Sequence, residues 1–154
     1  MICKVVYHGS QEYQQAVELR RQVLRFPLGL DFTTEQLDSE IDSFHFVGDV
    51  EGIVLATAMA NPLDIEVIKI RQVAVSQSQQ GKGYGRDIML FVEEWASQME
   101  YKTVVLHARG VVVDFYLKLG YELFDDPFEE VGIPHRKMRK FLGARLPDRI
   151  GELE

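Results

Sequence analysis

The spacing of hydrophobic and polar positions changes several times along the chain, and each change predicts an element. After Ser10, which can cap a helix, apolar residues recur every three or four positions until Pro27 ends the pattern. Thr33 and Gln36 form a capping-box pattern that predicts a short second helix. Strands are predicted where apolar and polar residues alternate or where a short run is entirely apolar. These runs are residues 2–7, 44–50, 53–60, 65–75 and 103–107.

The second half of the chain continues the mixture of helices and strands. A helix over 86–99 is predicted by one apolar face that carries Ile88, Phe91, Val92, Trp95 and Met99. A helix over 111–119 ends at Gly120, and strands at 121–124 and 134–141 flank an acidic loop, 125–130. The order of strand, helix, helix, three strands, helix, strand, helix and two strands predicts an α+β fold, with a mixed sheet between helices.

Length and composition indicate one domain. The chain has 154 residues, 46% of them apolar, which is enough for a single stable core. We expect this domain to occupy residues 1–142. Residues 143–154 contain Pro147 and Gly151 and show no period, so we expect a loosely held C-terminal extension.

Charge and cysteine content exclude several classes. A formal net charge of −7 disfavours nucleic acid and anionic membranes as partners. The single cysteine, Cys3, excludes an internal disulfide and is expected to be a small buried residue of the first strand. Because no signal peptide or long apolar run is evident, we expect a cytoplasmic protein. No spacing of His, Cys and carboxylates predicts a metal site.

The most informative segment for function is the glycine-rich stretch Gln-Gly-Lys-Gly-Tyr-Gly at 80–85, between a predicted strand and a predicted helix. Glycines permit a sharp turn, and the free N–H groups of a helix N-terminus bind phosphate. A P-loop would need Lys and Ser or Thr where Arg86 and Asp87 stand. A dinucleotide fingerprint counted from Gly81 would need glycine at position 86. Both of these readings are therefore weak.

The stretch resembles a third phosphate-binding device, the pyrophosphate loop of the GNAT acetyltransferases, at every fixed position of the pattern Gln/Arg-x-x-Gly-x-Gly/Ala. The preceding residues 72–75 resemble that family's strand before the loop. Residues 114–121, Asp-Phe-Tyr-Leu-Lys-Leu-Gly-Tyr, resemble its second signature. Residues 132–135 with Met138, together with Val23, Leu24 and Pro27, resemble the ElaA-like subgroup of small bacterial acetyltransferases. The resemblance extends from about Arg20 to Phe141.

This resemblance implies an N-acetyltransferase that moves an acetyl group from acetyl-CoA to a primary amine by direct attack, with a splayed strand pair that binds the CoA arm. It implies that the backbone of Gly81, Gly83 and Gly85 holds the pyrophosphate, with charge from Lys82 and Arg86 and with Gln80 and Tyr84 in the same loop. The backbone of Val73, Ala74 and Val75 would then pair with the pantetheine arm and face the thioester carbonyl. Tyr116 would lie near the sulfur and protonate the thiolate.

The general base is the residue that the resemblance leaves open. Many relatives carry a glutamate on the strand before the loop, where this chain has Arg71 and Gln72. His45 and His135 are the candidates, because an imidazole titrates near neutral pH. His8 and His107 rank lower. Arg109 also departs from the family, in which many members have an asparagine that touches the pantetheine arm.

Two other classes of function stay open. The first is a CoA-binding sensor or interaction module with little transferase activity, which the missing glutamate favours; the second, weaker one is a nucleotide-binding protein. The expected acceptor is a small molecule or a protein amine, and a homodimer is left open. The basic side chains Arg20, Arg21 and Arg25 form either a solvated helix face or a surface that steers an anionic acceptor.

Overall fold

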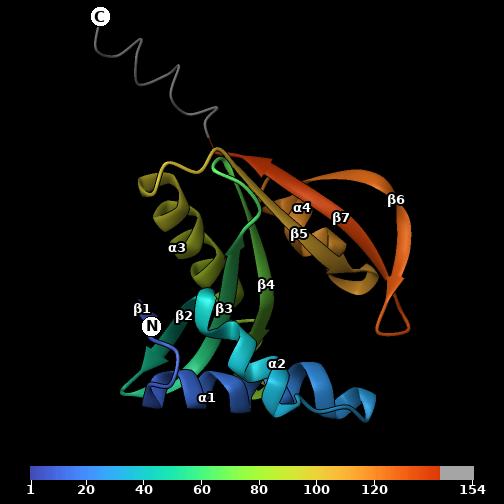
Figure 1. Cartoon of the computed structure of the whole chain (residues 1–154). Coiled ribbons are helices and arrows are strands. Elements are labelled where there is room, and N and C mark those ends of the chain that lie inside the picture. Colours follow the sequence, from blue (N-terminus) through green and yellow to red (C-terminus); the bar gives the residue numbers. More distant parts are fainter. Residues whose placement is uncertain (143–154) are drawn as a thin grey trace, which may run out of the picture. The chain divides into compact units, whose positions relative to one another are not determined.

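The computed structural model describes residues 1–142, which form an α+β fold built on one mixed sheet (Figure 1). The strand order in the sheet is β1-β2-β3-β4-β5-β7-β6. The strands are β1 (Ile2–Val6), β2 (Phe44–Val50), β3 (Ile53–Pro62), β4 (Val67–Val75), β5 (Thr103–Arg109), β6 (Glu122–Glu130) and β7 (Ile133–Phe141). The α-helices are α1 (Gln11–Arg20), α2 (Thr34–Ser39), α3 (Tyr84–Gln98) and α4 (Val113–Lys118). The predicted fold class is confirmed, and the predicted extension at 143–154 lies outside the described residues.

The described residues divide into two compact units. The first contains Met1–Asn61 and Ile70–Val92, and the second contains Pro62–Lys69 and the chain from Glu93 onward. The first unit therefore includes the glycine loop and the end of β4. The second includes β5, α4, β6 and β7.

Helices cover both faces of the sheet in the first unit. Phe46 and Val47 are adjacent on β2, so their side chains point to opposite faces, and both are fully buried. Val47 belongs to a core cluster with Tyr13, Ala16 and Val17 of α1. On the other face, the rings of Phe46 and Phe91 of α3 have centroids 6.2 Å apart. The sheet of this unit is thus packed between α1 and α3.

The helical segment before Pro27 has the predicted extent, but its last part is not α-helical. The Ser10 hydroxyl accepts a hydrogen bond from the Tyr13 N–H and begins α1 as predicted. After Arg20 the chain continues as a π-helix, Arg21–Arg25, and then as a 3₁₀ turn that contains Pro27. The predicted capping box at Thr33 and Gln36 is present at the start of α2.

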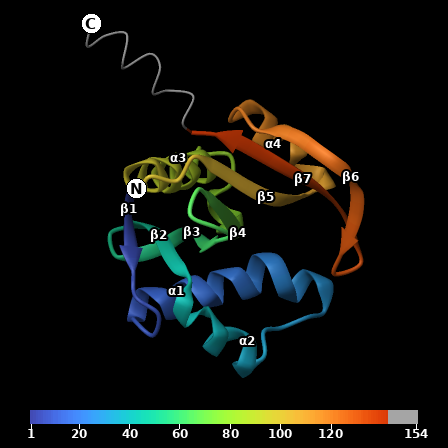
Figure 2. The same ribbon diagram turned by 45° about the horizontal axis from the view of Figure 1, so that its top comes forward.

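In the second unit, β7 lies between β5 and β6 and is antiparallel to both, as Figure 2 shows. Leu106 of β5 faces Met138 of β7, and both are buried. Lys140 lies two residues after Met138 and therefore on the same face of β7, where its ammonium meets α3 and the end of α4. The opposite face of β7 carries His135, Lys137 and Arg139.

The sequence prediction is wrong about the acidic stretch 125–130 and about Met99. The acidic stretch 125–130 is not a loop, because β6 continues through it with a register shift between Phe124 and Phe128. Asp125 of this stretch pairs with Lys137 of β7, and the stretch lies on an edge strand, where charged residues are tolerated. Met99 lies beyond the end of α3 and is 53% exposed, whereas Met89 and Ala96 of α3 are fully buried.

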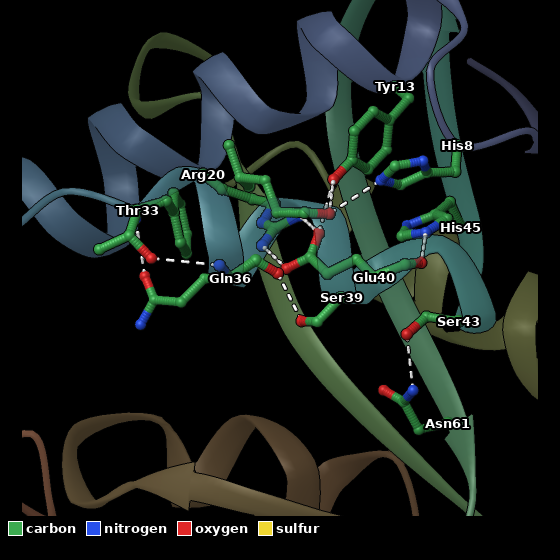
Figure 3. A network of polar contacts seen from close by, with 12 residues as sticks. His8, Tyr13, Arg20, Thr33, Gln36, Ser39, Glu40, Ser43, His45 and Asn61 are labelled. Atoms are coloured by element: carbon green, nitrogen blue, oxygen red, sulfur yellow. Dashed lines mark hydrogen bonds and ion pairs between the residues drawn. The ribbon is translucent and has the colours of Figure 1, made fainter.

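A buried ion pair joins α1 to the turn before β2 (Figure 3). The Arg20 guanidinium donates to both carboxylate oxygens of Glu40, with Nη1 to Oε1 at 2.8 Å and Nη2 to Oε2 at 2.6 Å. The Tyr13 hydroxyl donates to the same Oε1 at 2.8 Å. Only 2% of Arg20 and 8% of Glu40 are exposed, so water solvates neither charge and each depends on its partner. Arg20 is therefore neither a solvated residue nor a steering residue.

The neighbouring arginines hold the loop before α2. The guanidinium groups of Arg20 and Arg25 lie over the ring of Phe32, at 4.5 and 4.7 Å from its centroid. Arg21 donates from Nε to Asp31 at 2.9 Å on the surface. All three side chains of the basic cluster thus fix the path between α1 and α2.

Replacing Glu40 with glutamine tests the buried ion pair. The variant leaves the Arg20 guanidinium buried without its counter-charge, so we expect the free energy of unfolding to fall by about 3 to 5 kcal/mol in urea denaturation at neutral pH. Asp31→Asn is the matched control, because it breaks an exposed pair and should cost much less stability than Glu40→Gln. Equal losses in the two variants would contradict a stabilising role that depends on burial.

The same pair predicts a dependence of stability on pH. Burial alone would raise the pKa of Glu40, but the hydrogen bonds and charge of Arg20, with the Tyr13 hydroxyl, outweigh burial and hold this pKa below its usual value. A lowered pKa means that the stabilisation is complete above the usual carboxyl range and is lost as the pH falls through the folded-state value. The difference in unfolding free energy between wild type and Glu40→Gln should therefore shrink on acidification, and a constant difference would contradict this assignment.

Candidate functional site

The glycine loop has a backbone that only glycine adopts easily at two positions. Gly81 has a φ of 86° and Gly83 a φ of 84°, whereas Gly85 lies within α3 and has no positive φ. A Cβ atom added at Gly81 or Gly83 would meet nothing within 4 Å. The chain therefore needs glycine at these positions for the backbone angle and not for lack of space inside the protein.

The two glycines lead directly into the N-terminus of α3. The Asp87 N–H donates to the Gly83 carbonyl at 3.0 Å, which is the start of the helical hydrogen-bond pattern. Helix geometry therefore leaves the N–H groups of Tyr84, Gly85 and Arg86 without an acceptor inside the helix. These groups and the positive end of the helix dipole form a place where an anion is stabilised.

Side chains brace the loop and add charge to it. The Gln80 amide donates to the Val75 carbonyl at 3.2 Å and so ties the loop to the end of β4. Lys82 donates to the Gln79 side chain at 2.9 Å and is exposed, as is Arg86. Two cations thus flank the free N–H groups, and the predicted loop residues all lie together in the first unit.

The end of β4 leads into this loop and contains a backbone irregularity that the sequence did not predict. Val73 and Val75 are half-buried, and Ala74 is buried. Just before them, Gln72 has a φ of 56°, a left-handed conformation that is unusual for a residue other than glycine in a strand. Its side-chain oxygen is buried without a hydrogen-bond partner among residues 1–142. Gln72, with a strained backbone and an unpaired side-chain oxygen, therefore directly precedes residues 73–75.

Tyr116 lies on α4 in the second unit and is 7% exposed. Its ring packs edge-on against Phe115 and Tyr121, with centroids 5.0 and 5.7 Å away. Burial raises the pKa of the Tyr116 phenol, so its hydroxyl keeps its proton at neutral pH and can act as a donor.

A polar network holds the end of α4 next to Tyr116. Glu93 of α3 is 5% exposed and accepts hydrogen bonds from the Tyr121 hydroxyl and from the Lys140 ammonium, both at 2.8 Å. Lys140 also donates to the Leu119 carbonyl at 2.7 Å, just past the last turn of α4. Because Tyr121 contacts Tyr116, this network limits the positions that the Tyr116 ring can take.

His45, a candidate base, lies on β2 in the first unit and is 4% exposed (Figure 3). Its Nε2 is 2.8 Å from the Glu40 carbonyl, and its ring lies edge-on to Tyr13 with centroids 4.7 Å apart. Burial lowers the pKa of His45, which favours the neutral imidazole. A carbonyl oxygen can only accept, so Nε2 carries the proton and donates a hydrogen bond to the Glu40 carbonyl.

His135, the other candidate, lies on β7 in the second unit and is also 4% exposed. Its Nδ1 is 2.8 Å from the Ile133 carbonyl, and its Nε2 is 3.8 Å from Glu130. The second carboxylate oxygen of Glu130 pairs with His107 of β5 at 3.0 Å. Glu130 thus links His135 to His107. From the sequence alone, His107 ranks lower as a candidate base and Glu130 is expected in a loop.

Two further properties concern metals and membranes. Among residues 1–142, no group of three or more His, Cys, Asp and Glu side chains is arranged to hold a metal ion. Within the same residues, each helix is too short or too polar to cross a bilayer.

Known proteins resemble this chain in sequence and in fold. The model of the acetyltransferase (GNAT) domain family matches residues 30–142. The UPF0039 protein C11D3.02c of Schizosaccharomyces pombe is 31% identical over 93 residues, which are 59% of this chain and 62% of that protein. This alignment therefore spans less than two thirds of that relative.

Two solved structures share the fold. Escherichia coli ElaA is 23% identical with a TM-score of 0.77, over 90% of this chain and 98% of ElaA. A GNAT family acetyltransferase from Elizabethkingia anophelis, with acetyl-CoA bound, is 17% identical with a TM-score of 0.71, over 91% of this chain and 97% of that one. The predicted fold and the predicted family are confirmed. This chain belongs to the GNAT acetyltransferases, a family of acyl-CoA-dependent N-acyltransferases.

Proposed function

We propose that this chain transfers the acetyl group of acetyl-CoA to a primary amine of a small molecule or of a protein, by direct attack of the amine on the thioester. The observation that carries the proposal is the pair of left-handed glycines, Gly81 and Gly83, that opens onto the free N–H groups of α3. Such a loop can bind a diphosphate. Because the chain belongs to the GNAT acetyltransferases, we infer that this diphosphate is the one in CoA. The cytoplasmic location stays a prediction, and the oligomeric state stays open.

The residues of the first unit would bind the donor. The N–H groups of residues 81–86 would donate to the pyrophosphate oxygens, and Lys82 and Arg86 would balance their charge. The backbone of Val73 and Val75 would pair with the amide groups of the pantetheine arm. An N–H at Val73 or Ala74 would donate to the thioester oxygen and stabilise the oxyanion that forms during attack. The left-handed φ of Gln72 supports this arrangement, because an irregular residue in a strand disturbs the regular ladder beside it.

Tyr116 would supply the proton for the leaving group. The neutral amine adds to the carbonyl carbon, the C–N bond forms, and the C–S bond then breaks with its electron pair on sulfur. The Tyr116 hydroxyl would give its proton to this thiolate, which leaves as CoA thiol, and the proton that the nitrogen loses as the amide forms would restore the tyrosine hydroxyl. The position of Tyr116 supports this role, because its buried phenol keeps its proton at neutral pH and is available when the thiolate forms.

A thiol-release assay tests the proposed activity. Acetyl-CoA is mixed with the protein and with tyramine, spermidine or a short lysine-containing peptide, and we expect amine-dependent release of CoA with at least one of them. Acetyl-CoA should also raise the melting temperature, whereas ATP and NAD should not. A rise in melting temperature without amine-dependent release would favour the sensor module over the enzyme.

Substitution of the loop glycines tests the donor site. Gly81→Ala and Gly83→Ala force an L-residue into a left-handed backbone, so we expect CoA to bind about 5- to 30-fold more weakly in calorimetry, since about 1 to 2 kcal/mol of strain distorts the loop. Gly52→Ala is the matched control, because Gly52 has a φ of 82° in the β2–β3 turn and an equally open Cβ position. We expect this control to lose similar stability but to keep its affinity for CoA. An equal loss of affinity in all three variants would refute a specific role for the loop.

Replacing Tyr116 with phenylalanine tests the proton donor. The ring contacts with Phe115 and Tyr121 are kept, so we expect an unchanged melting temperature and affinity for acetyl-CoA, with a turnover number reduced about 100-fold. Tyr121→Phe is the control, because it removes the hydrogen bond to buried Glu93 and should lower stability more than turnover. Full activity of Tyr116→Phe would exclude the hydroxyl as the donor.

A further inference from the structure

One side-chain cluster of the second unit is not used by the donor site. It lies on the face of β7 that carries His135 and Lys137, opposite the face packed against Glu93 of α3. His107 of β5 is directly opposite Lys137 in the register, and Phe128 of β6 is opposite His135. The cluster thus gathers two imidazoles around the carboxylate of Glu130.

The contacts of His107 determine which of its nitrogens carries the proton. Its Nδ1 is 3.0 Å from Glu130 Oε1 and 3.4 Å from the Lys69 ammonium. An ionised carboxylate accepts hydrogen bonds and cannot donate, so the shorter contact requires a proton on Nδ1. This tautomer leaves Nε2 with a free lone pair, which is the atom that a general base uses.

The surroundings of Glu130 keep it ionised and fixed. Burial would raise the pKa of Glu130, but His107, His135 and Lys69 together outweigh it and lower the pKa. The Phe128 ring packs against both imidazoles, with centroids 4.9 Å from His107 and 5.8 Å from His135. The carboxylate is therefore held between the two histidine rings.

The two histidines differ in what they can reach. The side chain of His135 is 5% exposed, and its Nδ1 is already bonded to the Ile133 carbonyl. The side chain of His107 is 24% exposed. Its bond to Glu130 uses Nδ1, so the lone pair on Nε2 is not used by that bond. Only His107 combines access to a ligand with a carboxylate that orients it.

We propose that His107, oriented by Glu130, is the general base that takes a proton from the ammonium group of the acceptor. This inference rests on the proposed function. The ammonium gives one proton to His107 Nε2, and the freed amine nitrogen attacks the thioester carbon. The second proton leaves the nitrogen as the amide forms, the thiolate takes one proton, and one proton passes to solvent. Glu130 is a positioning residue, because it acts through His107.

The tautomer of His107 can be measured without any acceptor. In the full chain labelled with ¹⁵N at histidine, NMR at alkaline pH should show a protonated Nδ1 and an unprotonated Nε2 for His107. In Glu130→Ala this preference should be lost. A protonated Nε2 in the wild type, with Lys69 donating to Nδ1, would overturn the proposal.

The kinetic test uses the pH profile of thiol release with tyramine, spermidine or the lysine peptide. In His107→Gln we expect turnover to fall about 100-fold and the acidic limb of the profile to disappear, with unchanged affinity for acetyl-CoA. In Glu130→Ala that limb should shift. The charged groups that face His107 are Lys69 of β4, Glu130 of β6 and, across the register, Lys137 of β7, so Lys137→Gln tests whether general charge accounts for the shift.

His8→Gln is the control, because His8 lies in the first unit and bonds to the Leu37 carbonyl at 2.8 Å. We expect it to keep the wild-type profile. An unchanged profile in His107→Gln would overturn the role of His107, whatever the stability of the variant. Absence of amine-dependent release by the wild type would instead overturn the proposed function, and the NMR measurement would still decide the tautomer.

Discussion

The Arg20–Glu40 ion pair is the contact on which the N-terminal third of the chain depends. Two charges removed from water are tolerable only if each satisfies the other, so the end of α1 and the turn before β2 are fixed relative to one another. Other contacts of this segment are made to the same two residues. The Tyr13 hydroxyl completes the coordination of the carboxylate, and Phe32 lies beneath the guanidinium. The α-helical hydrogen bonding gives way to a π-helix directly after Arg20.

The same segment explains why His45 differs from the histidines of the second unit. The His45 ring fills the space beside Tyr13, and its Nε2 holds the carbonyl of the residue whose carboxylate pairs with Arg20. Its hydrogen bond is therefore one of those that fix the turn before β2. In contrast, His107 is held by a side-chain carboxylate on its inner nitrogen, which leaves the outer nitrogen uncommitted. The chemistry available to each histidine thus depends on which of its ring nitrogens is hydrogen-bonded to the rest of the protein.

Local patterns in the sequence predict most of the fold and part of the candidate site. Alternation and capping residues identify β1 to β5 and the starts of α1 and α2, because these signals act over a few residues. Glycine spacing identifies the loop, and its geometry has the two positive φ values that the spacing demands. The Glu130 contact is different, because it joins residues 23 positions apart across three strands, and no local period reports such a pairing. The strain at Gln72 is invisible for a similar reason, since glutamine has no preference for a left-handed backbone.

The open space around Gly81 and Gly83 has a consequence for the chirality of the loop. Both residues have a backbone shape that L-residues avoid and that D-residues prefer, while no neighbouring atom lies within 4 Å of an added Cβ. A D-alanine introduced by chemical synthesis at either position would therefore avoid the backbone strain that L-alanine causes. The cost of an ordinary L-substitution in this loop comes from handedness and not from steric crowding.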